Sequence, residues 1–278
     1  NGFIIIAWEV TSALALILTA VYFVPKYLKM GLTTIPQFLE TRFDGFTRSL
    51  VAFFLMISFV VTLLPIVLYT GAINLESIFN ISNLLQVSKS QAMIYTICAI
   101  GLIGSLYAIF GGLKAVAVSD TLNGYGLLIG GLAIPFLALA SIGDGNVIDG
   151  LIKVYQNSPE KFNVIGAKDS VMPFEVLFTG LIINQIYFWC MNQMIVQRAL
   201  GAKNLKEAQK GLLFTGLLKL LVPLIIILPG VIGFYYYGDF FYDNQDMIYP
   251  ELIKKVLPVS FIGVCLLYTS DAADDVLC

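Results

Sequence analysis

The stretch "IIIAWEVTSALALILTAVYFVP" (residues 4–25) decides the fold class of this chain. It is an apolar run long enough to cross a lipid bilayer, which a helix of about 20 residues spans. It carries one charge, on Glu9. A carboxylate at the centre of a bilayer costs about 2.5–3.5 kcal/mol on insertion scales. The stretch therefore predicts a membrane-spanning helix in which something compensates the burial of one carboxylate.

The remainder of the chain is just as apolar. Of its 278 residues, 58% are hydrophobic and 12% are charged, whereas about 25% of the residues of an average soluble domain are charged. The charges cluster, and the uncharged stretches between them predict six membrane spans, at about residues 3–24, 49–72, 91–113, 119–141, 174–197 and 211–237. The chain is therefore predicted to be an all-α polytopic membrane protein.

The composition also argues against several classes of function. The net charge is −2 and no basic patch suits a nucleic acid, so no nucleic-acid partner is expected. Histidine, the commonest metal ligand and a frequent general base, is absent from the sequence. The four cysteines show no zinc-type spacing. With no GxSxG motif and no paired catalytic carboxylates, the chain is not expected to be an enzyme.

The basic residues predict the orientation in the membrane. If the first span runs from outside to inside, the inside segments hold nine Lys and Arg residues and the outside segments hold six. The short connections after the first and fifth spans are the most basic, and short basic connections stay in the cytoplasm. We therefore expect a multi-pass protein of the cell's inner membrane, with these two connections and the one after the third span cytoplasmic.

Two connections are predicted to contain short helices. In the first connection, Thr34 can cap a helix that has Pro36 in its first turn, and Phe38 and Phe43 give this helix an apolar face for the membrane surface. A second short helix is expected at residues 249–256, in the segment after the last span.

Three ionisable residues lie within or at the edge of the predicted spans: Glu9, Asp120 and Lys219. Ionisable groups at membrane depth face a cavity or a partner, and they mark candidate functional sites. A structural ion pair between Glu9 and Lys219 is the alternative interpretation, because the sequence alone does not show that the two are close.

The fifth span is rich in amides. Its helical spacing can place Gln185, Phe188 and Asn192 on one face. Amides are costly toward lipid, so they either line a polar cavity or hydrogen-bond a neighbouring helix. Carboxylate, ammonium and amide groups beside aromatic rings suit a sugar, whose hydroxyls both donate and accept hydrogen bonds and whose C–H faces stack on rings.

Several longer motifs resemble one family. They are "IFGGLKAVAVSD" (109–120), "NQMIVQRALGAKNLKEAQKGLLFTGLLKLLVPLIIILPG" (192–230), "GLTTIPQFLETRF" (31–43) and "YFWCMNQ" (187–193). With them, residues 5–264 resemble the sodium/solute symporter family, and within it the bacterial sodium/galactose (sodium/glucose) cotransporters.

The resemblance implies a leucine-transporter-like fold of two inverted five-helix repeats, with substrate and sodium bound near the midplane and access alternating between the two sides. The six spans would be core helices two to seven of ten. Residues 1–264 are then expected to be a truncated transporter domain. The last residues, "CLLYTSDAADDVLC" (265–278), resemble the translation of a sequencing adapter. Sodium is implied as the coupling ion with no other cofactor, and its main ligands would lie on helices outside this piece.

The resemblance also implies roles for individual residues. The matching positions are Glu9, Ser12, Gln185 and Lys219 for substrate binding, Trp8 and Phe188 for the gates, and Asp120 for the sodium path. Three of them depart from the galactose transporters. Gln185 stands where those proteins have asparagine, and Phe188 and Trp8 stand where they have tyrosine.

The sequence therefore predicts a sodium-coupled symporter that imports a hexose such as galactose or glucose, with the sugar, sodium and the lipid bilayer as its partners. Another solute, such as an inositol, sialic acid or proline, is the first alternative. A symporter-like sensor domain of a signalling protein is the second.

Overall fold

The structure is a computed structural model that describes residues 2–238 and 247–256, and all regular structure in these ranges is helical. The chain forms two compact units. The first contains Asn1–Ile57 and Pro159–Ile227, and the second contains Ser58–Ser158 and Leu228–Cys278. The predicted adapter-derived tail, 265–278, lies outside the described residues.

The first unit begins with one long interrupted helix. A 3-10 turn at Gly2–Ile5 leads into α1 (Ile6–Leu18), and a π-helical turn at Thr19–Phe23 joins α1 to α2 (Val24–Lys29). The short α3 (Ile35–Arg42) and then α4 (Gly45–Ser58) follow.

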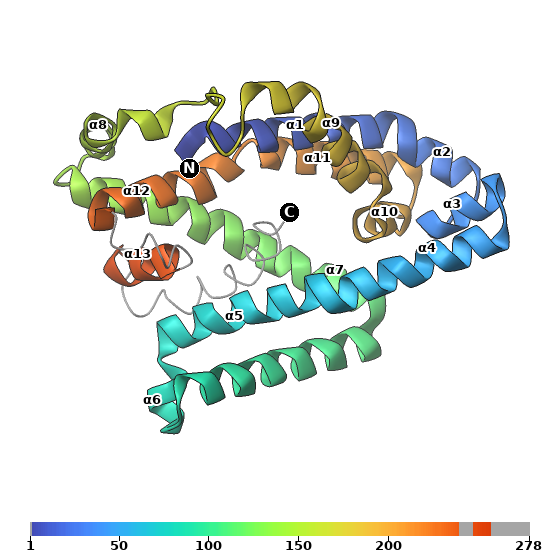
Figure 1. The fold of residues 1–278 in the computed structure, drawn as a ribbon, viewed down its shortest axis with the longest axis horizontal. Helices are drawn as coiled ribbons and strands as arrows, with labels where there is room; N and C mark the ends of the chain where they lie inside the picture. Colours follow the sequence, from blue (N-terminus) through green and yellow to red (C-terminus); the bar gives the residue numbers. More distant parts are fainter. Residues whose placement is uncertain (1, 239–246, 257–278) are drawn as a thin grey trace. The chain divides into compact units, whose positions relative to one another are not determined.

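The later part of the first unit is more broken. Its elements are 3-10 turns at Pro159–Phe162 and Phe174–Phe178, α9 (Gly180–Ile186), a π-helical turn at Tyr187–Met191, α10 (Gln193–Leu200), α11 (Leu205–Lys219) and a π-helical turn at Pro223–Ile227. Helices α1, α9 and α11 lie side by side (Figure 1). Leu16 and Ala20, on the first long helix, are completely buried against Trp189 and Leu212.

The second unit is built around α7. Its elements are a π-helical turn at Phe59–Leu63, α5 (Leu64–Phe79), α6 (Ile81–Leu85), α7 (Lys89–Ile142), α8 (Val147–Asn157), α12 (Leu228–Tyr237) and α13 (Ile248–Val256). Helix α7 packs against α5, α8, α12 and α13. A reciprocal capping box between Ser88 and Gln91 starts α7.

Helix α7 is two helices joined at a sharp break. Gly112 has φ +59° and ψ −165°, a combination that essentially only glycine adopts. The chain reverses there, and the first half of α7 returns along α5 (Figure 1). The break lies at the end of the predicted span 91–113, before the next predicted span at 119–141.

Five helical segments of the described chain are long and apolar enough to cross a membrane. They are Gly2–Lys29, Gly45–Phe79, Lys89–Gly112, Lys114–Ile142 and Leu205–Tyr237. They overlap five of the six predicted spans. The remaining prediction, 174–197, corresponds to several short pieces, of which the apolar Gly180–Met191 is the longest. The helix breaks at Asn192, whose backbone is extended at ψ 129°.

Both predicted short helices are present. Thr34 caps α3 and accepts a hydrogen bond from the Gln37 N–H at 3.4 Å, with Pro36 buried in the first turn. Helix α13 begins within one residue of its predicted start and buries Leu252 and Ile253 completely.

We predict that Gly112→Ala destabilises the second unit by about 1–3 kcal/mol, because an L side chain is strained at this backbone conformation. The measurement is unfolding of the full-length protein in a detergent titration. Gly124→Ala is the matched control, since Gly124 lies in a helical part of α7 with open space around it and the change should be neutral or stabilising. Equal effects of the two substitutions would contradict the assignment of strain to Gly112.

Candidate functional site

Glu9 and Lys219 form a buried ion pair in the first unit. Glu9 lies in the first turn of α1, and Lys219 is the last residue of α11. The Glu9 Oε2 and Lys219 Nζ atoms are 3.3 Å apart, and the side chains are only 11% and 9% exposed. The sequence alone could not show whether these two charges are close, and the structure shows that they form an ion pair.

Small residues allow α1 and α11 to approach closely enough for this pairing. A Cβ atom on Gly216 would lie 3.5 Å from the Ala13 carbonyl oxygen and 3.7 Å from the Leu16 Cβ. Ser12 is fully buried on α1, and its hydroxyl donates to the Glu9 carbonyl oxygen at 2.7 Å. Ser12 is therefore bonded within its own helix, one turn from the carboxylate.

The Trp189 ring lies beside the ion pair. The Lys219 Nζ lies 4.9 Å from the centroid of the Trp189 ring, which is a cation–π distance. The Trp189 indole N–H donates to Gln185 Oε1 at 2.7 Å, and Gln185 Nε2 donates to the Trp8 carbonyl oxygen at 3.3 Å. These two hydrogen bonds fix which end of the Gln185 amide carries the donor.

The predicted shared face of Gln185, Phe188 and Asn192 is wrong in one respect. The π-helical turn and the extended backbone at Asn192 end the helix before that residue. Asn192 instead caps α10, where its Oδ1 accepts the Met194 N–H at 2.9 Å. Phe188 stays beside the site and meets the Trp189 ring edge-on at 5.1 Å.

A buried hydroxyl joins two of the π-helical turns. The Thr19 Oγ1 atom lies 2.8 Å from the Ala15 carbonyl oxygen and 3.1 Å from both the Trp189 carbonyl oxygen and the Cys190 Sγ. The Tyr27 hydroxyl makes a second hydrogen bond to this segment, donating to the Cys190 carbonyl oxygen at 3.0 Å. These bonds hold the Trp189 segment against the first long helix.

The structure brings together six of the seven sequence-predicted residues. Trp8, Glu9, Ser12, Gln185, Phe188 and Lys219 all belong to the first unit. Asp120 lies in the second unit, half-buried on α7. Trp189 and Thr19 were not predicted from the sequence. The spacing of four residues between Gln185 and Trp189 was the available signal for Trp189, and nothing in the sequence distinguishes Thr19 from other hydroxyls in apolar runs.

The sequence was compared with models of known protein families. The model described as "Sodium:solute symporter family" matches residues 1–269. The chain belongs to the sodium:solute symporter family. It is a multi-pass membrane protein of a family of transporters, not of enzymes, as the sequence predicts.

Individual relatives agree. The chain is 46% identical over 263 residues to the uncharacterized symporter YidK of Escherichia coli (strain K12), which covers 95% of this chain and 46% of that protein. It is 34% identical over 245 residues to the sodium/glucose cotransporter of Vibrio parahaemolyticus, 86% of this chain and 43% of that protein. It is 28% identical over 306 residues to the sodium/myo-inositol cotransporter of Bos taurus, 96% of this chain and 41% of that protein. The chain thus spans less than half the length of these relatives.

A solved structure agrees on the fold. The substrate-bound outward-open state of a Na+-coupled sialic acid symporter aligns with a TM-score of 0.69 and 20% identity, covering 99% of this chain and 56% of that one. The predicted fold class, a partial leucine-transporter-like membrane protein, is confirmed.

We predict that breaking the ion pair from one side destabilises the protein strongly. Glu9→Gln or Lys219→Met alone should each lower the free energy of unfolding by about 3–5 kcal/mol, because the remaining charge is left buried. The double variant Glu9→Gln/Lys219→Met should lose far less, since it buries no charge. Detergent-titration unfolding of all four proteins gives the coupling energy, and purely additive losses would contradict a direct pairing.

A second prediction concerns Trp189. Trp189→Phe keeps an aromatic ring but removes the N–H that holds Gln185, so we expect a loss of about 0.5–1.5 kcal/mol from the hydrogen bond plus a weaker cation–π contact. The same unfolding assay measures it. Trp8→Phe is the matched control, because only the backbone carbonyl of Trp8 bonds Gln185. A loss from Trp8→Phe as large as that from Trp189→Phe would contradict this role for the Trp189 indole.

Proposed function

We propose that the full-length protein is a sodium-coupled symporter for a neutral, polyhydroxylated ring solute such as a hexose or a cyclitol, and that Glu9 and Lys219 bind this solute. The observation that carries the proposal is the buried Glu9–Lys219 pair, with the Trp189 ring beside it.

The pair is a poor way to stabilise a membrane helix bundle. Removing two charges from water costs several kcal/mol for each ion, and well-packed apolar residues in their place are often neutral or stabilising. A chain that is 58% hydrophobic could readily place apolar residues at both positions. Its use of a carboxylate and an ammonium here therefore favours a functional role for the pair.

The chemistry of the pair favours a neutral solute. The Glu9 carboxylate can accept hydrogen bonds from two hydroxyls, and the Lys219 ammonium can donate to hydroxyl oxygens. Hydrogen bonds to charged groups contribute about 1.5–3 kcal/mol each. The pair has no net charge, so a neutral polyol leaves the electrostatic balance unchanged, whereas an anionic solute would place a second negative charge near Glu9.

The neighbouring residues would complete the site. Trp189 offers a ring on which the C–H face of a sugar or cyclitol can stack. Gln185 can present its second amide N–H, because only one of its two amide N–H groups donates to the Trp8 carbonyl oxygen. Ser12 would support the backbone beneath Glu9, and Trp8 and Phe188 would act as gates. Separately, within the second unit, Asp120 would line part of the sodium path.

The relatives support the same solute class. One is named a sodium/glucose cotransporter and another a sodium/myo-inositol cotransporter, and glucose and myo-inositol are both six-membered rings rich in hydroxyls. In this proposal, one sodium ion moving through about 100 mV supplies about 2.3 kcal/mol. That energy corresponds to roughly fifty-fold accumulation of the solute.

We predict that the full-length protein in liposomes takes up labelled galactose, glucose or myo-inositol when an inward sodium gradient is present, and not when choline replaces sodium. Glu9→Gln should lower the uptake rate at low solute concentration by at least ten-fold, because one charged hydrogen bond of about 1.5–3 kcal/mol is lost.

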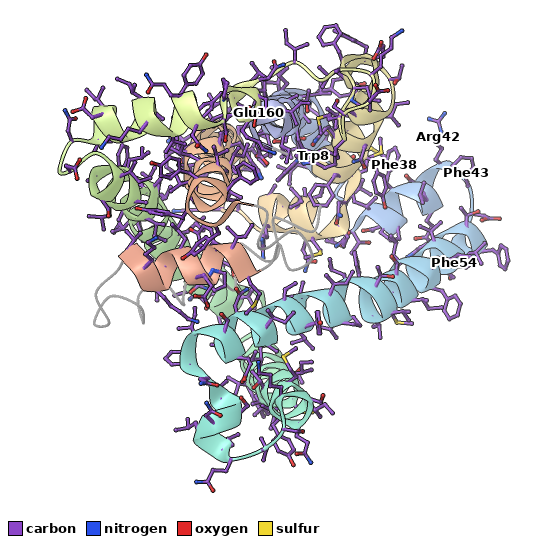
Figure 2. All side chains as sticks on the ribbon, turned by 60° about the vertical axis from the view of Figure 1, so that its left-hand side comes forward. Trp8, Phe38, Arg42, Phe43, Phe54 and Glu160 are labelled. Carbon is purple, nitrogen blue, oxygen red and sulfur yellow. The ribbon has the colours of Figure 1, made fainter. Side chains whose placement is uncertain are left out.

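Glu160→Gln is the matched control for uptake. It makes the same chemical change at an exposed position of the first unit, labelled in Figure 2, and should transport at the parental rate. Sodium-dependent uptake that survives unchanged in a folded Glu9→Gln protein would contradict the role given to Glu9. A folded parent protein that takes up none of the three solutes would contradict the solute class.

A further inference from the structure

The junction of α2 and α3 carries a group of exposed basic side chains. Lys26 and Lys29 lie in the last turn of α2, and Arg42 lies in the last turn of α3. All three are exposed. This junction connects two segments that can cross the membrane, Gly2–Lys29 and Gly45–Phe79, so it lies where the chain meets the membrane surface.

The fold packs the two helices that carry these basic side chains against each other. The chain turns at Gly31, with φ +65°, and α3 then packs back against α2. The Tyr27 and Phe38 rings touch edge to face, with centroids 6.0 Å apart. Lys26 and Lys29 lie three residues apart on one face of α2, and Arg42 lies one helical turn beyond Phe38 on α3.

Helix α3 is held in this position by contacts to α10. The Ile35 N–H donates to Gln193 Oε1 at 2.8 Å, and Val196 is completely buried between Tyr27 and Leu32. The basic group is therefore presented on a fixed framework, so little ordering of the backbone is needed when a ligand binds.

The nearby carboxylates offset only part of this charge, because Glu40 and Asp44 face four cations, Lys26, Lys29, Arg42 and Arg48. Glu40 pairs with Arg48 at 2.6 Å. Asp44 accepts the Thr47 N–H at 2.7 Å, and hydrogen bonds from the Thr47 side chain and backbone lower the pKa of its carboxyl. Within residues 2–238 and 247–256, neither Lys29 nor Arg42 has an ion-pair partner, and Lys26 lies 5.6 Å from the centroid of the Tyr22 ring.

Exposed aromatic residues border the basic group. Tyr22, Phe43 and Phe46 are 55%, 65% and 73% exposed. Figure 2 shows Arg42 and the adjacent Phe43 at the end of α3, extending outward from the ribbon. Cations beside aromatic rings are typical of the boundary between lipid headgroups and acyl chains.

We propose that Lys26, Lys29 and Arg42 bind the headgroup phosphate of an anionic phospholipid, with Tyr22 and Phe43 contacting its acyl chains. Three positive charges at the membrane surface complement the negative headgroup, and Arg42 can bind a phosphate with two parallel hydrogen bonds. The proposal needs only the membrane position of the junction and is independent of the transported solute.

The test uses the full-length protein in lipid bilayers with a Phe43→Trp reporter. Its fluorescence is quenched by brominated phosphatidylglycerol or by brominated phosphatidylcholine, and the signal of the protein without the reporter is subtracted. We expect the reporter to favour phosphatidylglycerol. Lys26→Gln and Arg42→Gln should each lower this preference roughly five-fold, the effect of one basic side chain near an anionic surface.

Two variants sharpen the test. Arg42→Lys keeps the charge and should keep most of the preference. Lys89→Gln/Lys168→Gln removes two exposed charges elsewhere, and should leave the preference unchanged. A preference that survives in Lys26→Gln/Arg42→Gln, or one that falls equally in the Lys89/Lys168 variant, would overturn the proposal. Because quenching requires no transport, this result is separate from the outcome of the uptake assay.

Discussion

The contact between the Glu9 carboxylate and the Lys219 ammonium is the constraint around which the first unit is organised. Each group alone would be expensive at membrane depth, and each is nearly buried. Pairing removes most of that cost only if α1 and α11 stay close. The small residues Ala13 and Gly216 permit this approach, so the helix packing and the charge pair depend on each other.

The helical segment of residues 180–200, which is interrupted at Asn192, also contributes to this site. Gln185 and Trp189 lie beside the ion pair, whereas Asn192 and the residues after it form the start of α10. The π-helical turn and the break at Asn192 separate these two tasks. Thr19 and Tyr27 then hold the irregular segment against the first long helix, supplying hydrogen bonds that its backbone does not make internally.

Much of this arrangement could be predicted from the sequence, because the bilayer imposes strong rules on composition. Uncharged runs indicated the helices, and Glu9 and Lys219 stood out as isolated charges within apolar segments. Thr34 indicated the start of α3, because threonine is a favoured N-cap residue. The sequence could not show that Asn192 would cap α10, since a regular helix and a π-helical turn need the same residue types. The helix ends at Asn192, whose backbone is extended, so Asn192 leaves the face that Gln185 and Trp189 share.

A structure of the full-length protein with sodium and its transported ring solute bound would show directly whether the Glu9–Lys219 pair binds the solute. We expect solute hydroxyls within hydrogen-bonding distance, about 2.6–3.2 Å, of both the Glu9 carboxylate and the Lys219 ammonium, with the ring stacked on Trp189. A solute bound elsewhere, with the Glu9–Lys219 pair unchanged and out of contact with it, would show that the pair is structural and would contradict the account.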